Sequence, residues 1–569
     1  MASSVIANAG NVIRVNSCEG DAAQLLQQAI DSAATYNGKP VTIMLMPGNY
    51  NISREKSSRH IYHISNTSSA TENPDPTKHI GLWFRNMRNV TFDGNGAWIV
   101  THGELSSLVV DNCANVVLKN FTLTAADPSV PEFKVLDVQP STMTVEVTPP
   151  SEFEIIDGEF NFVGDGWKFA DGARETYYPE FAQVFYPATN ITRRCESPLK
   201  DRKMARRLGE RIVQFEYDKT PDVHAGEIYQ LRHGIRNEAC GFFNMSKDIR
   251  LENIEFNFMG NFGLVGQYSE NLTYDNIRCR PALESKRTDA GFADFVQMSG
   301  CKGKIRIVNS YFEGAHDDPI NIHGTHLKVV ASDEPDMLTV RFMHDQSYGF
   351  TPFFKGDKVE IVDRHTLNCV MPATVKKVEK IDDYNFRLTL DKKIPELAGG
   401  SSSIEDWAVE NVTWTPDVEI INNYFSRIPT RGILITTRGK SLIQDNIFFR
   451  IPMPSILVSD DARGWYESGP VQDLVIRRNT FIECGSPVIA IWPEIDRFDK
   501  PVHKNILIEY NRFLMDSGKA LSAKGAENVI LKENTFILPP GNLDTISDLI
   551  ETENTSGLDV RDNVILKEK

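Results

Sequence analysis

Three aspartates lie at the start of two short segments that match each other residue for residue. The first segment, DFVQMSG, begins at Asp294, and the second, DPINIHG, begins at Asp318, directly after Asp317. Polar and apolar residues alternate in both segments, which is typical of a strand with one buried face. If the 24 residues from Asp294 to Asp318 form one turn of a solenoid, the two carboxylates lie on neighbouring strands, about 4.8 Å apart.

Carboxylates held this close together differ in protonation, because like charges raise one another's pKa. Hydrolysis of a glycosidic bond needs one carboxylic acid to protonate the leaving oxygen, and a second carboxylate that acts as a base on water or as a nucleophile. Crowded acids supply both forms. An Asp-Asp pair before a strand is usually a solvated turn, so the prediction of a glycosidase depends on the third acid one coil away.

A repeat along the chain supports the solenoid. Each copy has two apolar residues at alternate positions, then usually Asn, then another apolar residue. The copies begin about 23 residues apart, or 32 to 33 where a coil carries an extra loop. Such a repeat predicts an all-β, right-handed parallel β-helix, with Asn at the tight bends and in stacked ladders. Leucine-rich repeats are the competing solenoid, but their leucine spacing and helical segments are absent. The copies are NVVLKNFTL at 115, DIRLENIEF at 248, NLTYDNIRC at 271, KIRIVNSYF at 304, DVEIINNYF at 417, SLIQDNIFF at 441, DLVIRRNTF at 473, NILIEYNRF at 505 and NVILKENTF at 528.

The repeat is interrupted twice, and both interruptions read as short alternating strands. An amphipathic helix at 21–34 is placed to cap the open end of the coil stack. The basic run TRRCESPLKDRKMARRLGERI in the first interruption is interpreted as a solvated face. We expect the two insertions to wall the active cleft or to mediate oligomer contacts. The predicted units are an N-terminal cap with the first coils (1–124), a β-rich insertion (125–238), coils with the acids (239–324), a barrel-like insertion (325–416) and the C-terminal coils (417–569).

Composition excludes several classes of partner. The chain has 569 residues, 41% of them hydrophobic, and a net charge of −16, which disfavours nucleic acid and anionic membranes as partners. We expect no membrane insertion, because no apolar run approaches the length of a span, and no signal peptide is visible. The eight cysteines form no CxxC pair, and Cys279 and Cys484 are predicted to be buried free thiols. No metal and no cofactor are expected.

The acids on a predicted β-helix resemble those of the pectin-lyase-like glycosidases. The segment GAHDDPINIHG, the two insertions and the chain length are similar to glycoside hydrolase family 110, bacterial exo-acting α-1,3-galactosidases that include enzymes removing the blood group B galactose. The resemblance implies metal-independent, inverting release of galactose from galactose-terminated glycans. It also implies a secreted or periplasmic protein, and a homodimer is the assembly considered.

Carried over residue by residue, the resemblance makes Asp317 and Asp318 the paired acids and Asp294 their partner. Our hypothesis is that Asp294 is the general acid and the pair is the base on water. Simple stacking separates the carboxyl groups by about 5 Å, which is typical of retaining enzymes. Inversion therefore requires the side chains to diverge.

Candidate substrate-binding residues surround the acids. Arg431, in TRGILITTRG, aligns above Asp318 and either holds a sugar hydroxyl or pairs with the acids. His323, Gln297 and Asn321 belong to the two matching segments and are expected on the outer face of the sheet, within reach of sugar hydroxyls. Trp492 either stacks on a sugar face or packs beneath a loop, and Trp465, with Tyr466, is expected to form a wall of the cleft.

Three other functions remain open. A polygalacturonase shares the fold and the acids but cuts an acidic polymer. Its Asn-Thr-Asp and Arg-Ile-Lys triplets are not found in this chain. The position of the Asn-Thr-Asp triplet is occupied by Phe292-Ala293-Asp294. A polysaccharide lyase needs calcium or a basic residue beside a uronic acid. A non-catalytic carbohydrate-binding β-helix binds the same ligands without turnover.

Overall fold

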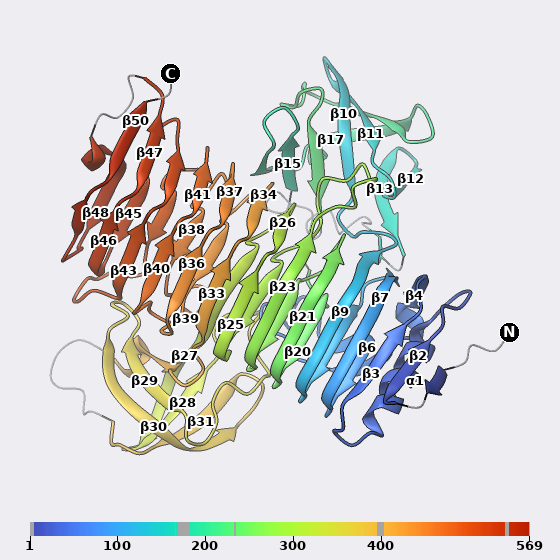
Figure 1. Cartoon of the computed structure of the whole chain (residues 1–569). Helices are drawn as coiled ribbons and strands as arrows, with labels where there is room; N and C mark the ends of the chain where they lie inside the picture. The colour runs from blue at the N-terminus through green and yellow to red at the C-terminus, as the bar shows by residue number, and fades with distance from the viewer. Residues whose placement is uncertain are drawn as a thin grey trace.

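The computed structural model describes residues 5–8, 10–165, 167–168, 182–232, 235–394, 403–540 and 545–567. The chain folds into stacked coils, as the repeat predicts, and forms a right-handed parallel β-helix that runs from the N-terminal to the C-terminal end of the molecule (Figure 1). The repeat segments lie side by side in one long parallel sheet. Its strands include β7 (Arg88–His102), β9 (Ala114–Ala125), β21 (Lys247–Phe256), β23 (Glu270–Cys279), β25 (Lys302–Val308), β33 (Asp417–Ile421), β36 (Ser441–Gln444), β40 (Leu474–Arg477), β43 (His503–Glu509) and β46 (Ala526–Lys532).

Identical residue types stack along the inside of the C-terminal coils. Phenylalanine rings of successive coils lie nearly parallel, with ring centroids 4.7–5.0 Å apart from Phe425 through Phe448, Phe481 and Phe513 to Phe536. This distance is about the spacing of neighbouring strands, so the coil rise itself sets the stack. Each ring is removed from water by the rings above and below, and no coil buries its apolar face alone.

A second column consists of buried asparagines, which form the ladder that the repeat predicts. In Asn446, Asn479 and Asn511, the side-chain nitrogen donates both to the Oδ1 of the asparagine in the following coil, at 2.9–3.0 Å, and to a backbone carbonyl of the preceding coil, at 2.9 Å. Their Oδ1 atoms also accept backbone N–H groups. The ladder therefore satisfies buried polar groups where the backbone turns.

Helix α1 (Ala23–Ala34) covers the N-terminal end of the coils, as expected for the segment at 21–34. It buries Leu25, Leu26, Ala29 and Ile30 and contacts β2 (Val12–Val15), β3 (Val41–Leu45), β4 (Asn49–Ser53) and β6 (Thr77–Arg85). The Asp21 carboxylate accepts the backbone N–H groups of Ala23 and Ser53, which fixes the start of the helix to the first coil.

The first interruption is an antiparallel sheet beside the coil stack, with its own hydrophobic core. A three-stranded sheet of β12 (Glu152–Ile156), β13 (Glu159–Gly164) and β14 (Trp167–Lys168) lies in the same stretch of chain. The strand order of the larger sheet is β16 (Ile191–Cys195), β15 (Ala182–Tyr186), β19 (Ile228–Leu231), β10 (Glu132–Gln139), β11 (Thr142–Val147), β18 (Ile212–Tyr217) and β17 (Arg202–Arg207).

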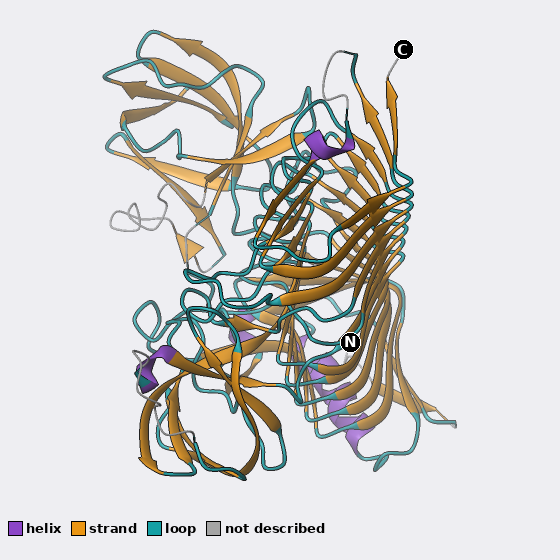
Figure 2. Cartoon of the chain, turned by 90° about the vertical axis from the view of Figure 1, so that its left-hand side faces the viewer, coloured by secondary structure: helices purple, strands orange, loops and turns teal. Residues whose placement is uncertain are grey.

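The second interruption is a closed antiparallel barrel. Its first strand, β27 (Ile320–Glu334), begins as a coil strand of the solenoid and continues without a break into the barrel. Both inserted units lie on the same side of the coil stack (Figure 2). The strands pair in a ring: β27, β28 (Met337–Arg341), β31 (Asn385–Leu390), β30 (Cys369–Lys380), β29 (Lys358–Asp363) and β32 (Trp407–Asn411), which returns to β27.

The two cysteines predicted to be buried free thiols lie in the described part of the chain. Cys279 is fully buried and Cys484 packs against the core, and both are free. Within the described ranges, no helix has the length and apolar character needed to cross a bilayer.

The asparagine ladder gives a stability prediction. Asn479→Ala removes the side-chain partner of the Ile443 carbonyl, of the Asn446 backbone N–H and of one side-chain N–H of Asn446, and each stranded buried group costs about 1–3 kcal/mol. We expect the midpoint of urea unfolding, followed by circular dichroism, to fall clearly. The control is Gln444→Ala, which removes a partner of Arg477 and should cost about 0.5 kcal/mol or less. Equal midpoints for the two variants would contradict the structural role of the ladder.

Candidate active site

The predicted register of the acids is present in the structure. Strand β24 (Val296–Ser299) pairs in parallel with the start of β27, with Val296 opposite Ile320. Strand β35 (Ile433–Ile435) pairs with β27 on its other side, with Ile433 opposite Ile320. Asp294, Asp318 and Arg431 each stand two residues before these paired positions, so they lie on three successive coils.

The three acids and Arg431 line a cavity of about 450 Å³. Asp294 and Asp318 are almost fully buried, at 7% and 2% exposure. Residues from the coils, from the first insertion and from the loop after β38 (Ile456–Val458) contribute to its wall. The lining residues are Asn66, Arg194, Arg236, Asp294, Asp317, Asp318, Asn321, Arg431, Leu434, Thr436, Leu457, Ser459, Asp460, Asp461, Arg463, Gly464, Trp465, Glu467 and Glu494.

Arg431 holds Asp318 with two side-chain contacts and one from the backbone. Its Nη2 lies 2.7 Å from Asp318 Oδ2, its Nε donates to Oδ1 at 2.9 Å, and its backbone N–H donates to the same oxygen at 3.1 Å. Of the two roles considered for Arg431, the structure shows pairing with an acid. Arg431 also lines the cavity.

Asp317 is held from a different direction. Arg194, on β16 of the first insertion, donates from Nη2 to Asp317 Oδ2 at 2.9 Å. This arginine belongs to the basic run that was interpreted as a solvated face. The Arg194 side chain is 45% exposed, as that interpretation predicts, but it also contacts an acid, because the insertion folds back so that the end of β16 reaches the site.

The surroundings drive the pKa values of Asp294 and Asp317 in opposite directions. Burial, reinforced by the charges of Asp317 and Asp318, raises the pKa of Asp294 well above its usual range. Burial alone would also raise the pKa of Asp317, but Arg194, Arg431 and other nearby arginines outweigh it and hold that pKa below its usual value. The site therefore contains a carboxylic acid that keeps its proton beside a carboxylate that has lost it.

Asp318 is intermediate between these two acids. Burial raises the pKa of Asp318 above its usual value, and the guanidinium of Arg431, which favours the ionised form, offsets only part of this rise. The three N–H contacts from Arg431 are those of a carboxylate, and the pKa of Arg431 is itself raised by Asp318 although burial opposes this. We therefore treat Asp318 and Arg431 as an ion pair.

Glu467, another carboxylate of the cavity wall, was missed by sequence reasoning. Its Oε1 accepts from the side-chain amides of Asn66 and Asn321, both at 3.3 Å, and lies 3.5 Å from His323 Nε2. Strand β39 (Glu467–Ser468) carries it and pairs with β27 at Gly324 and Thr325. No repeat signal marks this two-residue strand, so neither it nor Asn66 could be placed from the pattern.

The other predicted binding residues divide into two groups. Asn321 and Trp465 line the cavity. His323 and Gln297 were expected to reach sugar hydroxyls, but they are buried at 2% and 1% exposure and contact each other at 2.9 Å. Trp492 lies outside the cavity wall, with its indole N–H donating to Ser522 Oγ at 2.9 Å.

The burial of His323 and Gln297 has a physical cause. The loop around Ser65 covers this part of the sheet and is tied to it by Ser299, whose Oγ lies 3.2 Å from Ser65 Oγ. The His323 ring is further fixed through Nδ1, 2.6 Å from the Gly324 carbonyl. A period-two pattern identifies the outer face of a strand, but it does not show which loop covers that face.

The carboxyl groups of the site are arranged for proton transfer rather than for cation binding. Guanidinium groups already contact oxygens of Asp317 and Asp318, and a calcium ion at these oxygens would have to displace them against charge repulsion. Within the described ranges, no cluster of three or more His, Cys, Asp or Glu side chains has the arrangement of a metal site. The arrangement can protonate one oxygen atom while deprotonating another.

Comparisons with known proteins identify close relatives over almost the whole chain. Alpha-1,3-galactosidase A of Bacteroides thetaiotaomicron is 43% identical over 554 residues, which are 97% of this chain and 96% of the relative. Alpha-1,3-galactosidase A of Bacteroides fragilis is 36% identical, over 90% of this chain and 84% of the relative. Alpha-1,3-galactosidase B of Bacteroides thetaiotaomicron is 30% identical, over 91% and 83%. Residues 337–399, in the second insertion, match the family model GLAA-B beta-barrel domain II.

Proposed function

The chain belongs to the α-1,3-galactosidase family, and we propose that it is an exo-acting, inverting glycoside hydrolase that releases terminal α-1,3-linked galactose from glycans. The relationship to full-length relatives carries the proposal. The two acids with opposite pKa shifts, Asp294 and Asp317, support the chemistry, because glycoside hydrolysis needs one protonated and one ionised carboxyl group.

In the proposed reaction, Asp294 is the general acid and Asp317 is the base. Asp294 gives its proton to the glycosidic oxygen as the bond from that oxygen to C1 of galactose breaks. A water molecule attacks C1 from the opposite face, and its proton passes to Asp317. The product is β-galactose, and the two carboxyl groups regain their starting protonation by exchange with solvent. General acid–base catalysis of this kind contributes about 10²- to 10⁴-fold.

Inversion needs room for a water molecule between the base and the sugar. The arginine contacts support such an arrangement, because they draw the two neighbouring carboxylates toward different elements. Asp317 is held by Arg194 of the first insertion, and Asp318 by Arg431 of the next coil. Asp318 has a supporting role in this scheme: its charge raises the pKa of Asp294 and it orients Arg431.

Exo-action is supported by the enclosure of the site. A bare β-helix presents an open groove, whereas this cavity of about 450 Å³ is also walled by Arg194 from the first insertion and by the loop that carries Trp465. Its size is in the usual range for small-ligand pockets, about 300–1,000 Å³. A pocket of this kind suits a single terminal sugar.

The assigned roles predict different responses to two substrates. Galactosyl-α-1,3-galactose needs a protonated leaving oxygen, whereas fluoride leaves α-galactosyl fluoride with little help from an acid. Asp294→Asn should lower kcat/KM by about 10²- to 10⁴-fold on the disaccharide and far less on the fluoride. Asp317→Asn should lower the rate on both substrates, because both need activated water. Released galactose and fluoride ion report the rates.

Circular dichroism serves as the control for correct folding of both variants. The two roles would be reversed if folded Asp294→Asn protein lost hydrolysis of the disaccharide and of the fluoride equally, while Asp317→Asn protein still hydrolysed the fluoride. Near wild-type hydrolysis of the disaccharide by both folded variants would contradict the assignment of the site.

The contact between Arg194 and Asp317 gives a second prediction, which concerns the pH dependence of the reaction. The base must be ionised, so kcat/KM falls on the acid side as Asp317 gains a proton. Removing the adjacent positive charge destabilises the carboxylate and raises the pKa of Asp317. Arg194→Gln should therefore move the acidic limb of the kcat/KM profile to higher pH. Arg193→Gln, on the opposite face of the same strand, is the matched control. Coincident acidic limbs for the Arg194 variant and the wild type would contradict the electrostatic role of Arg194.

A further inference from the structure

An exposed tryptophan stands at the wall of the catalytic cavity. Trp465 lines the cavity and remains 49% exposed. The acids Asp294 and Asp318 are almost fully buried by comparison. One side of the indole stacks on His344 of the second insertion, with ring centroids 4.2 Å apart and an interplanar angle of 26°. An aromatic ring that is supported on one side and open on the other is a platform for another flat or apolar face.

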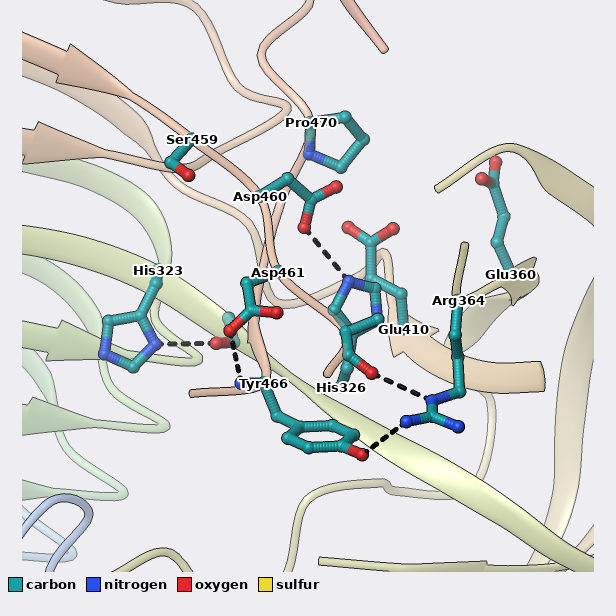
Figure 3. A network of polar contacts seen from close by, with 12 residues as sticks. His323, His326, Glu360, Arg364, Glu410, Ser459, Asp460, Asp461, Tyr466 and Pro470 are labelled. Atoms are coloured by element: carbon teal, nitrogen blue, oxygen red, sulfur yellow. Dashed lines mark hydrogen bonds and ion pairs between the residues drawn. The ribbon is translucent and has the colours of Figure 1, made fainter. Parts of the chain in front are cut away.

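The loop that carries Trp465 is fixed from within by one carboxylate. Asp461 is 8% exposed and accepts the backbone N–H groups of Arg463, Gly464, Trp465 and Tyr466. Figure 3 shows the contact with Tyr466. Four donors on one side chain define the path of the loop from residue 461 to 466. The position of Trp465 is therefore set before any ligand arrives.

The second insertion clamps the same loop from outside. Arg364, just after β29, donates from Nε to the Ala462 carbonyl at 2.9 Å and from Nη2 to the Tyr466 hydroxyl at 2.8 Å (Figure 3). Its Nη1 donates at 3.0 Å to the carbonyl of Glu405, which belongs to the insertion. Arg364 thus joins the two residues that flank the platform loop to the barrel.

We propose that Trp465 is the stacking platform for the second sugar of the substrate, the sugar that leaves, and that Arg364 is the positioning residue through which the barrel sets this platform. The proposal rests on the proposed function. In exo-cleavage the terminal galactose occupies the closed part of the cavity and its C1 faces the acids. The second sugar must then extend toward solvent, and the half-exposed indole lies on that side, open to an apolar sugar face.

Two substrates distinguish a loss of the platform from a loss at the catalytic centre. Galactosyl-α-1,3-galactose has a second sugar, whereas α-galactosyl fluoride has none. For Trp465→Ala we expect the ratio of kcat/KM values, disaccharide over fluoride, to fall about tenfold, mainly through KM. Trp98→Ala is the matched control, because Trp98 is 38% exposed on β7 and does not line the cavity. Its ratio should equal that of the wild type.

Arg364→Ala should lower the same ratio, and the double variant with Trp465→Ala should be no worse than Trp465→Ala alone. Arg364→Lys, which keeps the charge but cannot reach both loop acceptors with a planar fork, provides a second variant if the alanine protein does not fold. Arg497→Ala is the matched control, since Arg497 contacts Asp363 at 3.0 Å and not the platform loop.

An unchanged ratio in Trp465→Ala would overturn the platform, as would an equal loss on both substrates. Fully additive losses in the double variant would overturn the positioning role of Arg364. If the wild-type protein hydrolysed neither substrate, the proposed function would fall together with this inference. An active wild type with an unchanged ratio in the variant would refute the platform alone.

Discussion

Strand pairing at about 4.8 Å places the backbones of Asp294 and Asp318 on neighbouring coils, and both side chains are almost fully buried. Each acid stands two residues before a paired strand position, so the register of the coils keeps their backbones close together. Burial and mutual repulsion oppose ionisation of both, so the arrangement depends on nearby arginines. Arg431 and Arg194 neutralise Asp318 and Asp317, and Asp294 is left as the acid that retains its proton. The chemistry assigned to the site follows from this uneven distribution of positive charge.

The solenoid alone does not complete the site. Its coils provide Asp294, the Asp pair and Arg431, whereas Arg194 comes from the first insertion and His344, which supports Trp465, comes from the second. Strand β27 connects these parts physically, since it pairs with β24 and β35 in the coil stack and with β32 in the barrel. A displacement of the barrel would therefore be transmitted to the strand that directly follows Asp317 and Asp318.

The parts of the site that repeat with the coils were predictable from sequence, and the parts that do not repeat were not. The match between DFVQMSG and DPINIHG placed Asp294 next to Asp318, and the following repeat placed Arg431 above Asp318. Arg194 lies in an insertion without coil periodicity, so its approach to Asp317 depends on how that sheet docks. Glu467 lies in a loop whose path is set by Asp461 rather than by the repeat. The alternation of polar and apolar residues placed His323 on the outer face of its strand. Its burial, however, depends on the loop around Ser65, which lies far away in sequence.

The account depends on Asp294 and Asp317 acting on opposite faces of the sugar, and the configuration of freshly released galactose tests this most directly. Proton NMR of galactosyl-α-1,3-galactose hydrolysis, recorded before mutarotation, distinguishes the two anomers by the signal of the C1 proton. The account predicts that β-galactose appears first and that the α-anomer grows later at the rate of mutarotation. If α-galactose appeared first, the second carboxylate would act as a nucleophile, and the division of roles between Asp294 and Asp317 would be contradicted.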